Sequence, residues 1–162
     1  MDKLEKALKE NGLSLRPYQV EGVRTYLDWF NSNHGGIIAD EMGLGKTCQA
    51  VLLLYLLSEE KKLHRHLVVS PLSVVDFWLQ EIKRFGLGRL KVICYYGDVE
   101  QRKKARKMMK SPDWNICLTT YQYAISDMAS LHIKWDSVIV DEAHRLKNSE
   151  SLLHKTIREV RL

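Results

Sequence analysis

The amino-acid sequence predicts an α/β domain in which helices cover both faces of a parallel β-sheet. Short, continuous apolar segments alternate with longer amphipathic ones along most of the chain, which is typical of strands buried inside a parallel sheet. The 162 residues, 45% of them hydrophobic, are enough for one domain with a substantial core. Nine glycines and three prolines are too few for a disordered or collagen-like chain.

Two helices are expected before the first strand. Residues 2–10 carry apolar side chains at helical spacing, and the break at Asn11-Gly12 predicts that residues 1–12 form a separate N-terminal helix. Pro17 suits the first turn of a second helix, because the N–H that it lacks would have no helical partner there. The apolar face of this second helix comprises Val20, Val23, Leu27 and Phe30.

The rest of the chain is predicted to alternate strands with helices. Apolar segments predict strands at residues 36–39, 66–70, 91–95, 116–119 and 137–140. Amphipathic segments predict helices at residues 46–58, 73–85, 100–110, 121–130 and 149–160. The four tryptophans fall at the edges of these elements, where we expect packing rather than stacking on bases: Trp29, Trp78, Trp114 and Trp135.

The charge of the chain permits a polyanionic partner without requiring one. The 25 basic and 20 acidic residues give a formal charge of +5 and a pI of about 9.1. Because Cys48, Cys94 and Cys117 cannot all pair within the chain, we expect reduced thiols in an intracellular protein. The longest apolar run, residues 51–57, is far shorter than the ~20 residues of a membrane span, so no membrane contact is expected.

A phosphate-binding loop is predicted between the strand at 36–39 and the helix that follows it. Gly43 and Gly45 let the backbone direct N–H groups toward a phosphate at a helix N-terminus. Lys46 can then reach the β- and γ-phosphates, and the Thr47 hydroxyl can ligate Mg²⁺. The usual pattern has glycine where Asp40 stands, and a solvated lysine on a glycine-rich turn is the alternative interpretation.

Two acidic residues, Asp141 and Glu142, directly follow the last predicted strand. They should therefore lie at the carboxyl edge of the sheet, where α/β proteins bind ligands. Asp141 can hold Mg²⁺ through water, and Glu142 can polarise the water that attacks the γ-phosphate. A simple acidic helix start is the alternative. Together with the phosphate loop, these residues predict an ATPase site with Lys46, Asp141 and Glu142 as catalytic residues.

Two segments of the sequence carry a family likeness. Asp40-Glu-Met-Gly-Leu-Gly-Lys-Thr47 and Asp141-Glu-Ala-His-Arg-Leu-Lys-Asn148 resemble motifs I and II of the SWI/SNF-type ATPases. These enzymes are a branch of helicase superfamily two that drives chromatin remodelling, and Asp40 is normal at its position in that family. The likeness covers roughly residues 13–160, and residues 151–156 look most similar to the CHD and ISWI-like members.

The resemblance implies further nucleotide-site residues. Leu15-Arg-Pro-Tyr-Gln19 resembles the adenine-recognition motif, which implies that Gln19 hydrogen-bonds the adenine edge with Arg16 nearby. His144, in the Asp-Glu-Ala-His sequence of a DEAH box, would couple to a motif III, and no Ser/Thr-Gly-Thr-Pro-like sequence follows it. The complete set of implied nucleotide-binding residues is Arg16, Gln19, Gly43, Leu44, Gly45, Lys46, Thr47 and Cys48.

The family likeness also implies a fold and an activity. Residues 13–162 are expected to form part of a first helicase lobe, a RecA-like P-loop fold of three layers that is truncated before motif III. Such a lobe uses ATP and Mg²⁺ and acts with a second RecA-like lobe in cis on duplex DNA and nucleosomes in the nucleus. Because arginine fingers would come from the second lobe, we expect this chain to bind nucleotide but to hydrolyse it poorly. The alternatives are a DNA-repair or transcription translocase of the same superfamily and a non-motor nucleotide-binding interaction module.

Short hydroxyl side chains at strand ends are the first candidates for DNA contact. Ser70-Pro-Leu-Ser73 resembles motif Ia and Leu118-Thr-Thr-Tyr121 resembles motif Ib, with Phe77 where the family more often has Asn before Trp78. Phosphate contacts need such donors without base-specific geometry, which points to Ser70, Ser73, Thr119 and Thr120. Ser73 is equally suited to be a helix N-cap, with Asp76 three residues later.

A basic segment at residues 101–110 is the second candidate for DNA contact. One interpretation is a solvated helix that packs through Ala105, Met108 and Met109. The other is electrostatic contact with DNA phosphates, made by Arg102, Lys103, Arg106 and Lys107.

Overall fold

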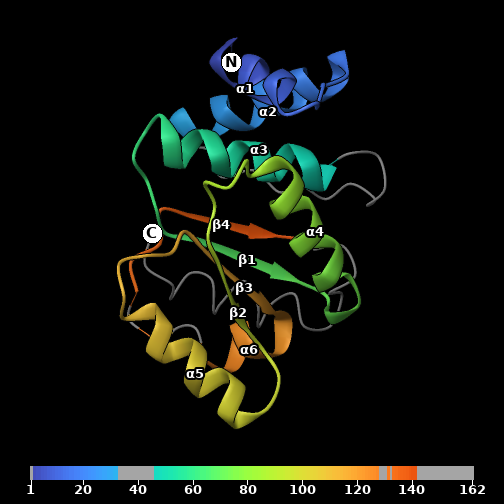
Figure 1. Cartoon of the computed structure of the whole chain (residues 1–162). Helices are drawn as coiled ribbons and strands as arrows, with labels where there is room; N and C mark the ends of the chain where they lie inside the picture. Colours follow the sequence, from blue (N-terminus) through green and yellow to red (C-terminus); the bar gives the residue numbers. More distant parts are fainter. Residues whose placement is uncertain (1, 33–45, 128–130, 132, 142–162) are drawn as a thin grey trace.

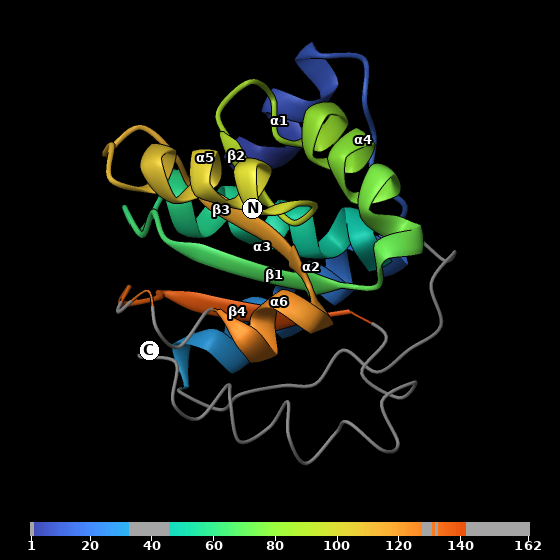
Figure 2. The same ribbon diagram turned by 90° about the horizontal axis from the view of Figure 1, so that it is seen from below.

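The structure of the chain is a computed structural model that describes residues 2–32, 46–127, 131 and 133–141. Within these ranges it contains a four-stranded sheet in the order β2-β3-β1-β4 (Figure 2). Every neighbouring pair of strands is parallel, as the sequence predicts. The strands are β1 (His66–Ser70), β2 (Val92–Tyr95), β3 (Ile116–Thr120) and β4 (Ser137–Val140).

The predicted strands within the described residues are confirmed. The bounds of β1 and β4 agree with the sequence, β2 begins one residue later than predicted, and β3 extends one residue further. The strand predicted at residues 36–39 lies outside the described residues.

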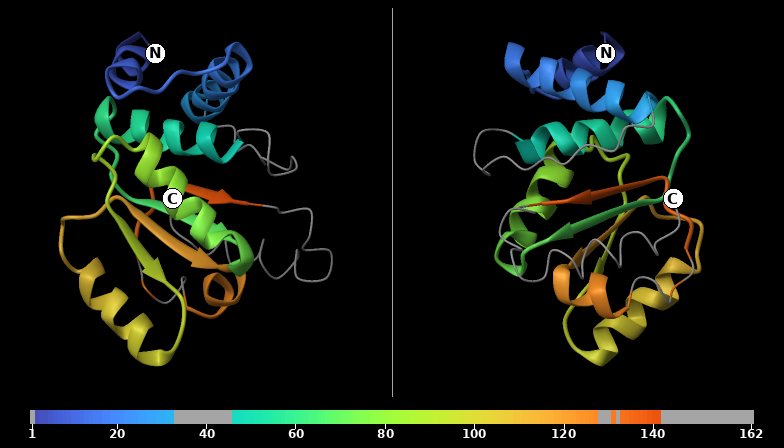
Figure 3. Two further views of the ribbon diagram at one scale, coloured as in Figure 1. Left: turned by 45° about the vertical axis from the view of Figure 1, so that its right-hand side comes forward. Right: turned by 180° about the vertical axis from the view of Figure 1, so that it is seen from behind.

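Helices cover both faces of the sheet (Figure 1). On one face lie α3 and α4, and α1 and α2 pack on the outer side of α3, away from the sheet (Figure 3). On the other face lie α5 and α6. The helices are α1 (Asp2–Glu10), α2 (Pro17–Asn31), α3 (Lys46–Glu59), α4 (Val75–Phe85), α5 (Val99–Met109) and α6 (Tyr121–Ser126). None of the described helices is both long and apolar enough to cross a membrane. The helix predicted at 149–160 lies outside the described residues.

The helix predicted at residues 73–85 begins later than expected. Pro71 opens a short 3₁₀ helix, η1 (Leu72–Val74), in which the Val74 N–H donates to the Pro71 carbonyl at 3.1 Å. Val74 is then the N-cap of α4, and no side chain caps this helix. The interpretation of Ser73 as an N-cap is therefore wrong, because the 3₁₀ turn places Ser73 inside η1.

Each face of the sheet has its own core, because alternate residues of a strand point to opposite sides. Val68 packs with α1 to α4, whereas Leu67 and Val69 pack with α5 and α6. Trp78 belongs to the first core, and Trp114 and Trp135 form an edge-to-face pair in the second, so these three tryptophans pack as predicted. Trp29 differs: it lies at the surface of α2, 38% exposed, beside Tyr26.

Helix α3 is buried on almost every side because it lies between the sheet and α2. Its apolar sequence suits that place, since a helix that is hydrophobic all round must be covered all round. Gly22 allows α2 to approach closely: a Cβ atom at this position would lie 2.0 Å from Oε1 of the buried Gln49 on α3. The absence of a side chain at Gly22 thus leaves room for the Gln49 side chain between α2 and α3.

A fully buried histidine joins the end of α3 to the sheet. The Nε2 atom of His66 lies 2.8 Å from the Leu63 carbonyl oxygen and 3.1 Å from Oγ of Ser58, and Nδ1 lies 2.7 Å from Oγ of Ser137. Because a carbonyl can only accept, Nε2 carries the proton and Nδ1 accepts from the Ser137 hydroxyl. Burial lowers the pKa of His66 from 6.5 to about 4.

This neutral histidine predicts a loss of stability in mild acid. Unfolded His66 takes up a proton near pH 6.5, whereas the folded state resists protonation until about pH 4. The free energy of unfolding should therefore decrease as the pH falls through this window, by up to about 3 kcal/mol from this group. Urea titrations at a series of pH values measure it.

The control is the exposed neighbour His64. His66→Gln should lower stability at neutral pH and flatten the pH dependence between 6.5 and 4, whereas His64→Gln should keep the wild-type slope. An unchanged slope in a folded His66→Gln chain would contradict the assignment.

Candidate functional site

The carboxyl ends of the strands gather polar residues at one edge of the sheet. Ser70, the last residue of β1, is in register with Thr120, the last residue of β3. On the other side of β1, the backbone N–H of Asp141 donates to the Val69 carbonyl oxygen at 2.8 Å, which continues the pairing with β4. Residues from three strands thus meet at the edge where α/β folds bind ligands.

Helix α3 begins on the same side of the sheet (Figure 1). Its first residues are Lys46, Thr47 and Cys48, so their backbone N–H groups belong to the positive end of the helix dipole. Lys46 is half-buried and Thr47 is buried. A lysine and a hydroxyl on the first turn of a helix are suited to anionic phosphate and to a hard cation.

Cys48 faces the core rather than solvent. Burial, reinforced by the nearby Glu81 carboxylate, raises the pKa of its thiol to about 12. The thiol is therefore neutral and unreactive, and Cys48 can serve a phosphate only through its backbone. The predicted site residues Gly43, Leu44, Gly45, Glu142 and His144 lie outside the described residues.

Asp141 is held by contacts from three directions. Besides its backbone bond to Val69, its carbonyl oxygen accepts a hydrogen bond from the hydroxyl of Tyr121. Its carboxylate oxygen Oδ2 accepts a hydrogen bond of 2.8 Å from Nε1 of the buried Trp78 on α4. Sequence reasoning missed Trp78 and Tyr121 as partners of Asp141, because no spacing within one element connects them.

The predicted adenine-recognition residues lie at the start of α2. Oε1 of Gln19 accepts from the Arg16 backbone N–H at 2.9 Å, so the Gln19 side chain caps this helix. The Gln19 amide nitrogen carries the remaining donors of that side chain. Arg16 and Tyr18 are exposed beside it, Tyr18 by 50%.

The predicted DNA-contact hydroxyls differ in exposure. Ser70 and Thr119 are fully buried, and their hydroxyls donate to the carbonyls of Pro71 and Tyr95. Thr120 is 6% exposed. Ser73 in η1 is exposed and is thus the most accessible hydroxyl of the four.

The basic helix α5 is divided into two faces. Arg102 donates to Oδ2 of Asp127 at 3.0 Å and Arg106 donates to the Tyr95 hydroxyl at 2.6 Å, so both guanidinium groups turn toward the protein. The Tyr95 hydroxyl in turn donates to Oδ2 of Asp127 at 2.8 Å. Although burial alone would raise the pKa of Asp127, hydrogen bonds that include those from Tyr95 and Arg102 lower it overall.

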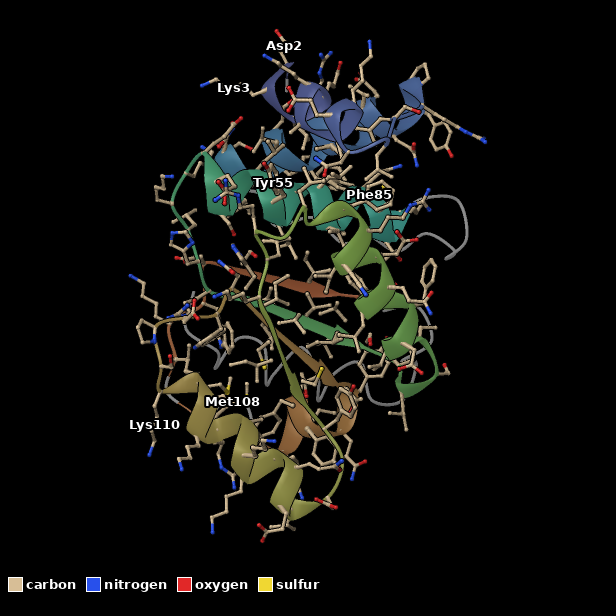
Figure 4. All side chains as sticks on the ribbon, viewed as in Figure 1. Asp2, Lys3, Tyr55, Phe85, Met108 and Lys110 are labelled. Carbon is tan, nitrogen blue, oxygen red and sulfur yellow. The ribbon has the colours of Figure 1, made fainter. Side chains whose placement is uncertain are left out.

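The opposite face of α5 is exposed and basic. Lys103 and Lys107 lie on it, with Lys110 at the outer end of the helix (Figure 4). Ala105 is buried as predicted, but Met108 is 48% exposed, which corrects its assignment to the packed face. A duplex that approached this helix would therefore meet the lysines.

The chain matches known proteins over most of its length. The family model of the SNF2-related domain matches residues 18–162. Chromodomain-helicase-DNA-binding protein 1-like from Danio rerio is 46% identical over 161 residues, which are 96% of this chain and 16% of that protein. Helicase SWR1 from Saccharomyces cerevisiae is 43% identical over 141 residues, which are 85% of this chain and 9% of that protein.

A solved structure supports the same assignment. The Sulfolobus solfataricus SWI2/SNF2 ATPase core in complex with dsDNA superposes with a TM-score of 0.74 at 33% sequence identity. The match covers 91% of this chain and 30% of that chain, so this chain spans less than a third of each protein named. The predicted likeness to SWI/SNF-type ATPases is confirmed: the chain belongs to the SNF2-related domain family.

Proposed function

We propose that this chain is the nucleotide-binding part of the first motor lobe of a DNA-dependent ATPase that remodels chromatin. The observation that carries the proposal is the edge of the sheet at which β4 presents Asp141, on the side where α3 begins with Lys46 and Thr47. These groups support the proposal because catalysis of phosphoryl transfer consists mainly of positioning and electrostatic stabilisation, which an acidic residue, a lysine and a helix N-terminus can supply.

The described residues fit Mg²⁺ and a nucleotide. The Thr47 hydroxyl and the Asp141 carboxylate are hard oxygen donors, and Lys46 with the α3 N-terminus supplies positive charge for phosphates. The bound cation would neutralise charge that develops on the phosphate oxygens. Gly43, Leu44 and Gly45 are proposed to add backbone donors, Glu142 to orient the attacking water, and His144 to couple this site to the rest of the motor. Arg16 and Gln19 are proposed to recognise adenine.

Duplex DNA and nucleosomes are the proposed substrates of the whole protein, with the nucleus as its location. Support comes from the relatives, one of which is named for DNA binding and another of which was solved with dsDNA. A second RecA-like lobe in cis is proposed to complete the ATP site. We therefore expect the chain by itself to bind nucleotide and to hydrolyse it slowly, because related phosphoryl-transfer sites gain about 10³–10⁵ in rate from an arginine finger.

The nucleotide site is tested by substitution of Lys46. Calorimetric titration of this chain with Mg·ADP should give saturable binding, and Lys46→Ala should weaken it at least about 10-fold through the loss of a charge-assisted phosphate contact. The matched control is Lys91→Ala, which removes an exposed lysine whose ion pair with Asp113 contributes little to stability. A folded wild-type chain that does not bind Mg·ADP would contradict the proposal.

We propose that the exposed lysines of α5 contact DNA phosphates, and removal of their charge tests this proposal. Lys103→Gln combined with Lys107→Gln should weaken binding to duplex DNA and reduce the slope of log K against log salt by about 2, because about two phosphate contacts are lost. Affinity is measured by fluorescence anisotropy at several salt concentrations.

The control removes the same charge from the other end of the molecule. Lys3→Gln combined with Lys6→Gln alters exposed lysines of α1, which lies far from α5 (Figure 1). This pair should leave the salt slope close to that of the wild type. Equal effects of both pairs would show that α5 is merely a solvated helix in a protein of positive net charge.

A further inference from the structure

Helix α4 brings a buried indole to the acidic edge of the sheet. The chain leaves β1 at Ser70, passes through η1 and enters α4, so Trp78 lies on the first turn of α4, eight residues after the end of β1. The Trp78 side chain is 1% exposed, and its Nε1 donates to Oδ2 of Asp141 at 2.8 Å. Trp78 thus contacts the carboxylate proposed to hold Mg²⁺ without itself being accessible to a ligand.

Two further contacts of Asp141 act on its backbone. Its N–H is bonded to the Val69 carbonyl and its own carbonyl to the Tyr121 hydroxyl, which together fix the position of Cα. The indole bond acts instead on the carboxylate and restrains its rotation. A hydrogen bond to a charged acceptor is stronger than one between neutral groups, so the indole N–H favours one orientation of the carboxylate.

The other two buried tryptophans of the sheet core, Trp114 and Trp135, show that a buried indole N–H in this protein does not require a carboxylate as its acceptor. Trp114 donates to the backbone carbonyl of Met109 at 3.1 Å. The Nε1 atom of Trp135 is buried without a hydrogen-bond partner. An indole in this fold can therefore be accommodated by a carbonyl or with no partner, so the pairing of Trp78 with the site aspartate is specific to this edge of the sheet.

We infer that Trp78 is a positioning residue that orients the Asp141 carboxylate for Mg²⁺, an inference that rests on the proposed nucleotide site. Groups that hydrogen-bond a metal ligand commonly change metal affinity 10–100-fold when they are removed. A purely structural tryptophan would instead affect stability and leave the dependence of nucleotide binding on Mg²⁺ unchanged.

The test compares the affinity of the chain for ADP with Mg²⁺ and with EDTA. In Trp78→Phe, which keeps an aromatic ring but loses the N–H donor, the ratio of the two affinities should fall about 10-fold. Affinity in EDTA should stay close to that of the wild type. The matched control is Trp114→Phe, which removes the same donor at the opposite, amino end of β3 and should leave the ratio unchanged.

A second variant guards against failure of Trp78→Phe to fold. Replacement of Trp78 by benzothienylalanine keeps the bicyclic shape and exchanges only the N–H for sulfur, and it should lower the ratio by a similar factor. If either folded variant keeps the wild-type ratio of ADP affinity with Mg²⁺ to ADP affinity with EDTA, Trp78 does not orient Asp141 for Mg²⁺. The proposed nucleotide site itself would not be contradicted by that result. A wild-type chain that does not bind ADP, or binds it equally with and without Mg²⁺, would overturn the proposed site and this inference together.

Discussion

Strand β1 is buried along its whole length and pairs in parallel with β3 on one side and with β4 on the other, and the rest of the structure depends on this double pairing. The register of β1 with β3 aligns Ser70 with Thr120, and its register with β4 aligns Val69 with Val140, so the carboxyl ends of the three strands meet at one edge. A slip of one residue would turn the side chains of β1 toward the wrong core. The apolar pattern that specifies the sheet therefore also fixes where Asp141 emerges.

Helices α3 and α2, which form the layers outside the sheet, hold the groups at its carboxyl edge in place. Helix α3 is enclosed between the sheet and α2, with Gly22 allowing the close approach to Gln49. Its first turn, with Lys46 and Thr47, is thus part of a packed element rather than of a loop. Sites carried on packed helices and strands hold their groups more precisely than sites on loops, which suits a reaction that depends on positioning.

Most of the fold could be predicted from the sequence because its signals are local. The apolar runs of β1 and β4 are short, continuous and bounded by polar residues, so their limits agree with the structure. The prediction that Ser73 caps a helix was wrong, because Pro71 opens a 3₁₀ turn directly after the strand and the α-helix begins only after that turn. That difference is one of turn chemistry and does not alter the fold.

The side-chain partners of the site could not be predicted because they join distant segments. On α5, basic residues surround much of the helix, and partners on other elements, Asp127 for Arg102 and Tyr95 for Arg106, hold two of them inward. Trp78 and Asp141 are 63 residues apart. No periodicity within one element encodes such a contact, since it arises from the packing of α4 against the sheet.

Asp127 and Asp141 differ in the groups that donate hydrogen bonds to them, and this difference fits a structural role for Asp127 and the proposed functional role of Asp141. Asp127 is in an ion pair with Arg102, so its charge is matched by a fixed guanidinium within the protein. Asp141 accepts a hydrogen bond from the Trp78 indole at its carboxylate and from the Tyr121 phenol at its backbone carbonyl, and neither of these two donors carries a positive charge. A neutral indole donor orients the carboxylate that it contacts without adding a positive charge beside it. A lysine or arginine in place of Trp78 would orient it too, but it would also compete with a divalent cation for the same negative charge.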